Sequence, residues 1–190
     1  MFGLIVILAL GAVVLVYFVG IYNGLVGLRE SVKTAWANID VLLKQRHDEL
    51  PKLIESCKRY MQFEEETFER VLRARGASSQ ASATGDVAAL SAGEQQLRAG
   101  MGRLFAVAER YALLKSDESF KQLQSRITGI EAAIADRREL YNEQVNLNNI
   151  RVSVRPAAML ARWCGFKPAH SLDFPGDQTR DVDVGTLFRA

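Results

Sequence analysis

The chain has 190 residues, of which 48% are hydrophobic and 24% charged, and a formal net charge of +2 at pH 7. This length allows one ordinary domain with an appendage. So small a net charge, with acidic residues within one helical turn of the basic clusters, argues against a nucleic-acid-binding protein. Cys57 and Cys164 form no CxxC pair, so the simplest interpretation is two reduced thiols in a reducing compartment.

The charges are distributed unevenly along the chain, because all 24 Lys and Arg and all 22 Asp and Glu lie at Arg29 or beyond. Residues 2–21 are twenty apolar or Gly residues in a row, and as a helix they would cover about 30 Å, the thickness of a bilayer's hydrocarbon core. We therefore predict a single-pass transmembrane anchor over residues 1–22. A cleaved signal peptide is disfavoured because no Lys or Arg precedes the run and no polar small-residue cleavage site follows it. A buried core helix would need far more protein to cover it.

Basic residues after the anchor predict its orientation. Only the terminal amine precedes the anchor, whereas Arg29, Lys33, Lys44 and Arg46 follow it within about twenty residues. The positive-inside rule then places the C-terminal domain in the cytoplasm and the anchor in the cell (inner) membrane.

Beyond the anchor, apolar residues recur at spacings of three and four, and no alternating run typical of a strand is present. The pattern predicts an all-α protein with four helical blocks of similar length, which span 23–48, 51–75, 86–114 and 117–152. Pro51 is expected to break or sharply kink the first helical stretch near residue 50, since proline costs a helix about 3 kcal/mol. The small, polar residues 76–86 are expected to form a mobile linker. An antiparallel up-down four-helix bundle over 23–152 follows from the short connections.

Pro156 is expected to end the last long helix, and an amphipathic segment follows over residues 153–172. Its apolar residues alternate with basic ones, a mixture suited either to a lipid headgroup interface or to capping the open end of the bundle. The candidate membrane-interface residues are Arg155, Arg162, Trp163, Phe166 and Lys167. Residues 173–190 hold four Asp and two Arg with little periodicity, and they are expected to be a disordered tail.

Three stretches resemble the LemA family: YNGLVGLRESVKTAWANIDVLLKQRHDELPKLIESCKRYMQFEEET from Tyr22, FKQLQSRITGIEAAIADRRELYNEQVNLNN from Phe120, and GFKP from Gly165. The resemblance implies a single N-terminal membrane anchor and a helical bundle, and it implies no established reaction. Relatives in that family include a protein of magnetosome membrane formation, which implies membrane organisation by analogy. The chain departs from the family pattern at Ala112, where a proline is usual, and at VRPAAML, where an aromatic-Pro pair is usual.

The residues that carry this resemblance are interpreted as structural. Trp36 is expected to be a buried residue positioned by polar neighbours rather than a ligand platform. The Tyr-Asn pairs that begin at Tyr22 and Tyr141 are expected to lie at the same height in the bundle, within about 20 Å of each other. The family-motif residues are Tyr22, Asn23, Trp36, Ile39, Asp40, Pro51, Leu123, Gln124, Arg138, Tyr141, Asn142, Gly165 and Phe166.

Motifs that would carry chemistry are weak. His47, Asp48 and Glu49 are adjacent, but the chain has only two His and a zinc site needs three or four ligands at defined spacing. The acidic run at residues 64–66 would fan over three faces of a helix as a solvated surface. No glycine-rich phosphate loop and no nucleophile elbow is present in the sequence. We therefore expect no catalytic residues, no metal, no cofactor and no enzymatic activity.

Two hypotheses of function remain. The first is a membrane-anchored helical scaffold that self-associates as a homo-oligomer, or recruits partners, at the cytoplasmic face of the membrane. The second is an adaptor or regulator of another membrane protein, such as a membrane protease. Both use the lipid bilayer as a partner through the N-terminal helix, and neither involves nucleic acid.

Overall fold

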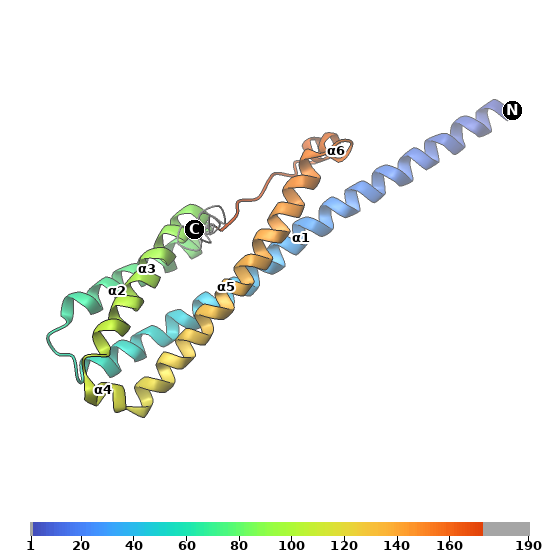
Figure 1. The fold of residues 1–190 in the computed structure, drawn as a ribbon. Helices are drawn as coiled ribbons and strands as arrows, with labels where there is room; N and C mark the ends of the chain where they lie inside the picture. Colours follow the sequence, from blue (N-terminus) through green and yellow to red (C-terminus); the bar gives the residue numbers. More distant parts are fainter. Residues whose placement is uncertain (1, 173–190) are drawn as a thin grey trace, which may run out of the picture. The chain divides into compact units, whose positions relative to one another are not determined.

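The computed structural model describes residues 2–172, and within that range the chain is helical without strands (Figure 1). This confirms the all-α fold class with a long N-terminal apolar helix and several packed helices. The expected disordered tail, 173–190, lies outside the described residues. The helices are α1 (Phe2–Lys58), α2 (Glu65–Thr84), α3 (Val87–Ala108), α4 (Ala112–Ser116), α5 (Glu118–Ser153) and α6 (Ala157–Trp163).

Helix α1 runs for 57 residues and contains Pro51, so the predicted break near residue 50 is wrong. A proline lacks the N–H that would bond to the carbonyl four residues earlier, here that of His47. In the structure the Nε of Arg75, on α2, donates a hydrogen bond of 3.0 Å to this carbonyl. The helix continues because a side chain replaces the hydrogen-bond donor that the proline lacks.

The first long helix ends instead at Lys58, and residues 59–64 turn the chain into α2. Met61 is fully buried in this turn, and the hydroxyl of Tyr60 donates to Asp117 Oδ2 at 3.0 Å. The connection is therefore held by packing and by a hydrogen bond to the start of α5. Four long helices are still formed, with the first division about ten residues later than the proline suggested.

The predicted linker over residues 76–86 is wrong as well, because α2 continues as helix to Thr84. Only Gly85, with a φ of 69°, and Asp86 turn the chain, and Asp86 caps α3 by accepting a hydrogen bond of 3.0 Å from the Ala89 N–H. Small residues let the two helices approach closely. A Cβ on Gly93 would lie 3.0 Å from the backbone of Ser78, which is itself fully buried.

The chain forms two compact units, each built from more than one stretch of sequence. We call residues 1–45 with 129–171 the anchor unit, and residues 46–128 with Leu172 the hairpin unit. Helices α1 and α5 contribute a segment to each. The domain boundaries expected at residues 22, 152 and 172 remain predictions.

The hairpin unit contains the main apolar core, to which α1, α2, α3, α4 and α5 all contribute. Helices α2 and α3 form an antiparallel hairpin, visible in Figure 1, and they have only 20 and 22 residues against 57 in α1 and 36 in α5. The helices are therefore not of similar length, and the four-helix packing belongs to this unit. Its buried apolar residues are Leu50, Leu53, Ile54, Cys57, Met61, Phe68, Val71, Ala74, Leu97, Met101, Leu104, Ala108, Leu114, Phe120 and Ile127.

The anchor unit pairs α1 and α5 in antiparallel orientation. The Trp36 and Tyr141 rings lie 5.6 Å apart. Leu25, eleven residues before Trp36, shares an apolar cluster with Val152, eleven residues after Tyr141. Tyr141 thus lies beside Trp36, which is 14 positions, or about 21 Å, beyond Tyr22 along α1. The expectation that the two Tyr-Asn pairs lie at one height is wrong.

Within the described residues, one helix is long and apolar enough to cross a membrane, and it is α1. Only 6% of its apolar window is buried inside the protein. That exposure distinguishes it from the core helix of a globular protein, which would be covered by its neighbours.

Replacing Arg75 by Leu should lower the free energy of unfolding by about 1–3 kcal/mol, because the carbonyl of His47 then has neither a helical nor a side-chain donor. Urea unfolding of the full-length chain in detergent, followed by circular dichroism, measures this. Arg73→Leu is the matched control, since the exposed Arg73 side chain pairs with Glu69 on the surface of the same helix. Equal losses in both variants would contradict the role assigned to Arg75.

Gly93→Ala should destabilise the hairpin unit by about 1–3 kcal/mol, because the added methyl meets the backbone of α2 and the helices must move apart. Gly102→Ala on the same helix meets nothing within 4 Å, and the higher helix propensity of Ala should raise stability by up to about 1 kcal/mol. The same unfolding measurement compares the two, and a loss at Gly102 as large as that at Gly93 would refute the close-packing explanation.

Candidate functional site

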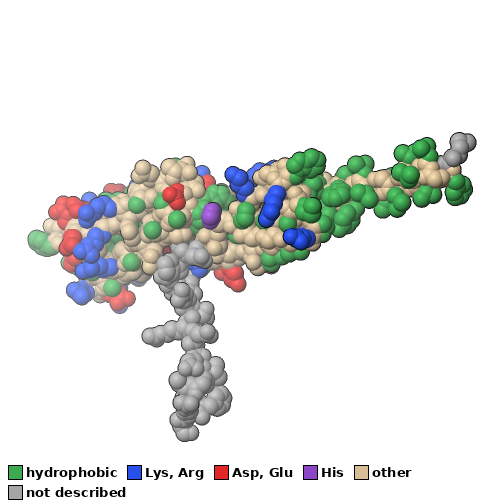
Figure 2. Space-filling model, turned by 90° about the horizontal axis from the view of Figure 1, so that it is seen from above, with side chains coloured by type: hydrophobic (Ala, Val, Ile, Leu, Met, Phe, Trp, Pro, Cys, Tyr) green, Lys and Arg blue, Asp and Glu red, His purple; other side chains and the backbone are tan. Residues whose placement is uncertain are grey.

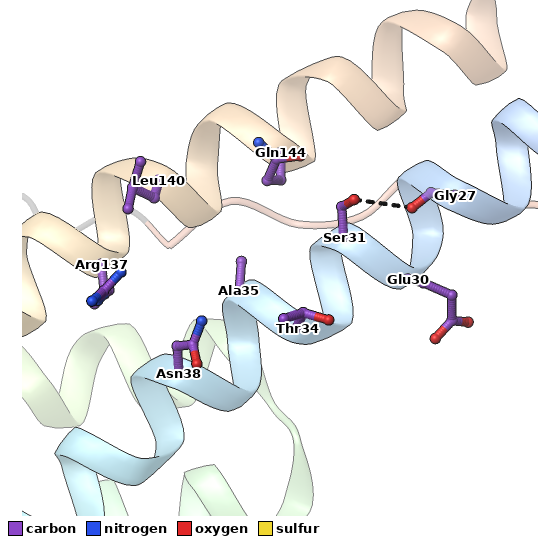
Figure 3. Close-up of a pocket in the computed structure, with 9 residues that line it drawn as sticks. All are labelled: Gly27, Glu30, Ser31, Thr34, Ala35, Asn38, Arg137, Leu140 and Gln144. Carbon is purple, nitrogen blue, oxygen red and sulfur yellow. Dashed lines mark hydrogen bonds between the residues drawn. The ribbon is translucent and has the colours of Figure 1, made fainter.

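An open groove of about 490 Å³ lies between α1 and α5 of the anchor unit (Figure 3). Most of its α1 residues are small or uncharged, and α5 supplies one cation, one apolar side chain and one amide. The groove is lined by Gly27, Glu30, Ser31, Thr34, Ala35, Asn38, Arg137, Leu140 and Gln144.

Two polar groups on the α1 side of this groove, those of Ser31 and Glu30, have partners within α1. Ser31 Oγ donates a hydrogen bond of 3.0 Å to the Gly27 carbonyl, one turn earlier. Glu30 points away from α5 in Figure 3 and pairs with Lys33 at 2.8 Å. The hydrogen bond from Lys33 holds the pKa of Glu30 below its ordinary value, so this carboxylate is ionised at neutral pH. The groove is thus suited to receiving a surface more than to activating a nucleophile.

One face of α5 in the anchor unit carries large apolar side chains that are about half exposed. Leu140, Leu147, Ile150 and Val154 are each between 44% and 54% exposed. Three of them recur every seven residues, and the fourth follows Leu147 by three, which is the spacing of a coiled-coil seam. We call these four residues the α5 stripe. Leu140 also lines the groove, so the stripe and the groove are continuous.

The C-terminal segment is tied to α5 by residues near the second Tyr-Asn pair. Tyr141 Oη donates a hydrogen bond of 2.9 Å to the carbonyl of His170, and burial raises the pKa of this tyrosine. The Asn149 side chain donates to the Ala169 carbonyl at 2.9 Å and accepts from its N–H at 2.8 Å. Trp36 packs on the Tyr141 ring and is half-buried, so it is less covered than the buried position expected for it.

The Gly-Phe motif ends α6 and returns the chain to α1. Gly165 has a φ of 74°, which an L-residue with a Cβ adopts only with strain, and the Phe166 N–H then reaches the Ala161 carbonyl at 2.9 Å. This turn places the Phe166 ring 5.9 Å from that of Tyr22, edge to face, and 5.4 Å from the guanidinium of Arg29. The first and last family motifs therefore meet in one contact.

The hairpin unit contains a buried ion pair that joins α1 to α3. Arg46 Nη2 donates to both carboxylate oxygens of Glu94, at 2.6 and 2.5 Å, and Ser78 Oγ also donates to this carboxylate. Both charged side chains are almost fully buried. His47 Nε2 lies 3.5 Å from Ser78 Oγ, and burial, together with the charge of Arg46, lowers the pKa of His47.

The remaining chemistry-bearing side chains have structural partners. Glu49 accepts hydrogen bonds from Arg126 at 2.8 Å and Lys52 at 3.2 Å. Burial raises the pKa of Cys57 to about 12, so this thiol stays protonated, whereas Cys164 is exposed. Over residues 2–172, no group of three or more His, Cys, Asp or Glu side chains is arranged to hold a metal ion.

The structure distributes the family-motif residues over both units and does not bring them to one site. In the anchor unit Ile39 is buried, Asp40 pairs with Lys44 at 2.5 Å, and Arg138 and Asn142 are half-buried, while Asn23 is exposed. Leu123, Gln124 and Pro51 lie in the hairpin unit. Of the interface candidates, Phe166 is half-buried and the other four, Arg155, Arg162, Trp163 and Lys167, are exposed.

Two features of these units were missed by the sequence analysis. Gly27, Ser31 and Ala35, spaced by four, form a line of small residues on α1, and this spacing was available as a signal of close approach or of a groove. The pairing of Arg46 with Glu94 had no such signal, because 48 positions separate the two residues and charged residues surround both in the sequence.

Glu94→Ala should lower the free energy of unfolding by about 3–5 kcal/mol, because it leaves the buried guanidinium of Arg46 without its carboxylate. Replacing both partners by Met should recover most of the loss, since the buried charges are then removed together. Urea unfolding of the full-length variants tests both statements. A double variant as unstable as the single one would show that lost packing, and not the unpaired charge, causes the effect.

Comparison with known proteins agrees with this architecture. Residues 35–185 match the sequence model of the LemA family. Magnetosome protein MamQ 2 and Magnetosome protein MamQ 1 of Paramagnetospirillum magneticum (strain ATCC 700264 / AMB-1) are each 26% identical in an alignment 173 residues long, gaps included, that covers 78% of this chain and 63% of each relative. Magnetosome protein MamQ of Magnetospirillum gryphiswaldense (strain DSM 6361 / JCM 21280 / NBRC 15271 / MSR-1) is 24% identical in an alignment 171 residues long that covers 77% of this chain and 62% of the relative.

The chain spans less than two thirds of the length of these relatives, so they share with it a region and not a whole protein. The family match covers far more than half of the chain, including Trp36, Tyr141 and the Gly-Phe motif. The chain therefore belongs to the LemA family.

Proposed function

We propose that the chain is a membrane-anchored, non-catalytic scaffold that self-associates at the cytoplasmic face of the membrane through the anchor unit. The observation that carries the proposal is the α5 stripe beside the α1–α5 groove. Together they form an uncovered apolar seam next to a line of small residues, a surface that another helix can bury.

The anchor is supported by the exposure of the first part of α1. Phe2, Leu4 and Val16 are among many large apolar side chains there that no part of the described protein covers. In water each would cost roughly 1.5–3 kcal/mol relative to burial, so a lipid environment is favoured. Arg29 and Lys33, the first basic residues after the apolar run, favour a cytoplasmic position for the rest of the chain.

Self-association is supported by the periodicity of the stripe and by the architecture of its unit. Only α1, α5 and the short α6 build the anchor unit, so α5 keeps a face without a helical neighbour. Two copies anchored in the same membrane present their α5 helices in parallel, and the seven-residue repeat lets the two apolar stripes bury each other. Membrane anchoring favours this further, because it confines the copies to a thin layer and raises their effective concentration.

The non-catalytic part of the proposal is supported by the state of the groove's polar groups. The Ser31 hydroxyl donates its hydrogen bond to the Gly27 carbonyl, and the Glu30 carboxylate forms an ion pair with Lys33. A role in membrane organisation is supported by similarity to relatives that carry the name magnetosome protein.

Leu147→Glu should convert an oligomer into a smaller species, because it places a charge in the centre of the seam that the copies bury. The measurement is the mass of the detergent-extracted, full-length chain by light scattering, with crosslinking in native membranes as a second readout. Leu113→Glu is the control, since Leu113 is an exposed leucine of the hairpin unit outside the stripe.

A wild-type chain that is monomeric and co-purifies with one other membrane protein would contradict self-association and favour the adaptor or regulator hypothesis. A wild-type oligomer whose mass is unchanged by Leu147→Glu would refute the stripe as the interface. Recovery of the chain in the soluble fraction would refute the anchor.

A further inference from the structure

Helix α6 is fixed to α1 at the end of the apolar run. Ile21 and Leu25 of α1 share a buried cluster with Ala157 and Ala161 of α6. The Tyr22 and Phe166 rings contact each other beside this cluster. All of these residues belong to the anchor unit, so the height of α6 along α1 follows from the structure.

The length of the anchor sets this height relative to a bilayer. If residues 2–21 cross the hydrocarbon core, Ile21 lies at its boundary. Residues 22–28, the last without charge, then extend about 10 Å further, through the headgroup layer. Since α6 packs against residues 21 and 25, it lies at the depth of the lipid headgroups.

The exposed side of α6 carries two large apolar side chains beside Arg162. Ala157, Ala158 and Ala161 are buried, whereas Met159 is 69% and Trp163 87% exposed. Met159 and Trp163 are four residues apart and therefore share one face of the helix. If α6 only capped the end of the bundle, its buried alanines would be explained, but the exposed Met159 and Trp163 would not. Tryptophan is enriched at membrane–water interfaces, where one end of its ring contacts apolar groups and the other contacts water.

The charge around α6 is of one sign. Residues 144–172 contain no Asp or Glu, and their four basic residues are Arg151, Arg155, Arg162 and Lys167. The Arg151 guanidinium lies near Gly24, 3.8 Å from where a Cβ would be, so the positive charge reaches the headgroup level of α1. Figure 2 shows basic side chains gathered at the inner end of the apolar segment. Each such residue contributes about 1 kcal/mol to binding at an anionic membrane surface.

We infer that α6 is a second membrane contact, which inserts Met159 and Trp163 among the headgroups of an anionic bilayer while the flanking Arg155, Arg162 and Lys167 bind lipid phosphates. The inference rests on the anchor of the proposed function and adds a lipid class and a contact to it. With the anchor at one point and α6 at another, the anchor unit is held in one orientation relative to the membrane.

The native cysteines allow a direct test in the full-length chain. Cys164, next to Trp163, is exposed, while Cys57 is fully buried and its thiol stays protonated, so a nitroxide reagent labels Cys164 selectively. The chain is reconstituted into vesicles of equal parts phosphatidylcholine and phosphatidylglycerol. Electron paramagnetic resonance then compares the label's accessibility to oxygen, which concentrates in lipid, with that to a water-soluble nickel complex.

Val41→Cys in a Cys164→Ser background is the matched control. Val41 is 63% exposed in the same unit, and it lies 13 residues, or about 20 Å, beyond Leu28 along α1. We expect the ratio of oxygen to nickel accessibility to be severalfold higher at position 164 than at position 41. It should fall in vesicles of phosphatidylcholine alone, because the basic residues then lose their anionic partners.

Tryptophan fluorescence gives an independent readout. Brominated lipid should quench the wild-type emission, and Trp163→Phe should remove most of the quenching, since the remaining Trp36 lies about 22 Å beyond Ile21 along α1.

Three outcomes would overturn the inference. A label at position 164 as accessible to nickel as that at position 41 would place α6 in water. A label at position 164 that is accessible to neither oxygen nor nickel, with spin–spin broadening that disappears on dilution with unlabelled chain, would show that a second copy covers α6 instead of lipid. Equal ratios in both vesicle types would overturn the assignment to anionic lipid. Each is distinct from failure of the proposed function, in which the chain does not sediment with the vesicles at all.

Discussion

The hydrogen bond from Arg75 to the carbonyl of His47 is the interaction on which the organisation of this protein depends. Pro51 would otherwise leave that carbonyl without a partner inside the fold. With the side-chain donor in place, α1 continues for seven residues beyond the proline, and one helix supplies the anchor, one wall of the groove and part of the hairpin core. Both compact units therefore share a continuous backbone, and a disturbance of α1 reaches each of them.

The sequence was sufficient for the features that depend on local composition and period. The uncharged run predicted the apolar helix, and spacings of three and four predicted an all-α chain. It was insufficient where a tertiary contact reverses a local preference. Pro51 disfavours a helix locally, but Arg75 donates the hydrogen bond that the proline cannot. Residues 76–84 have the composition of a linker, but they are helical where Ser78 packs against Gly93. Neither partner can be identified from the residues adjacent to it.

The same limit applies to the candidate site. Trp36 and Tyr141 were recognisable as motif residues, but their contact depends on the register of α1 against α5. The predicted first bundle helix ended at residue 48, ten residues or about 15 Å before the observed end at Lys58. The predicted partner of Tyr141 on this helix was therefore too close to the membrane. The groove and the α5 stripe follow from that register. Trp163 was recognisable as an interface candidate from its basic neighbours, but composition left open whether it faces lipid or caps the bundle.

The close packing of α2 on α3 repeats at a fixed interval. Gly93 meets Ser78 and Gly100 meets Val71, so seven residues separate the contacts on each helix. An insertion between these two contacts keeps both helices in register only if it adds a multiple of seven residues to each helix. Its turn is closed by backbone hydrogen bonds from Gly85 to Ala81 and Ser82 and by the Asp86 cap on Ala89. The hairpin is thus a modular extension, whose reach evolution or an engineer can alter in steps of about 10 Å while α1 and α5 keep their register.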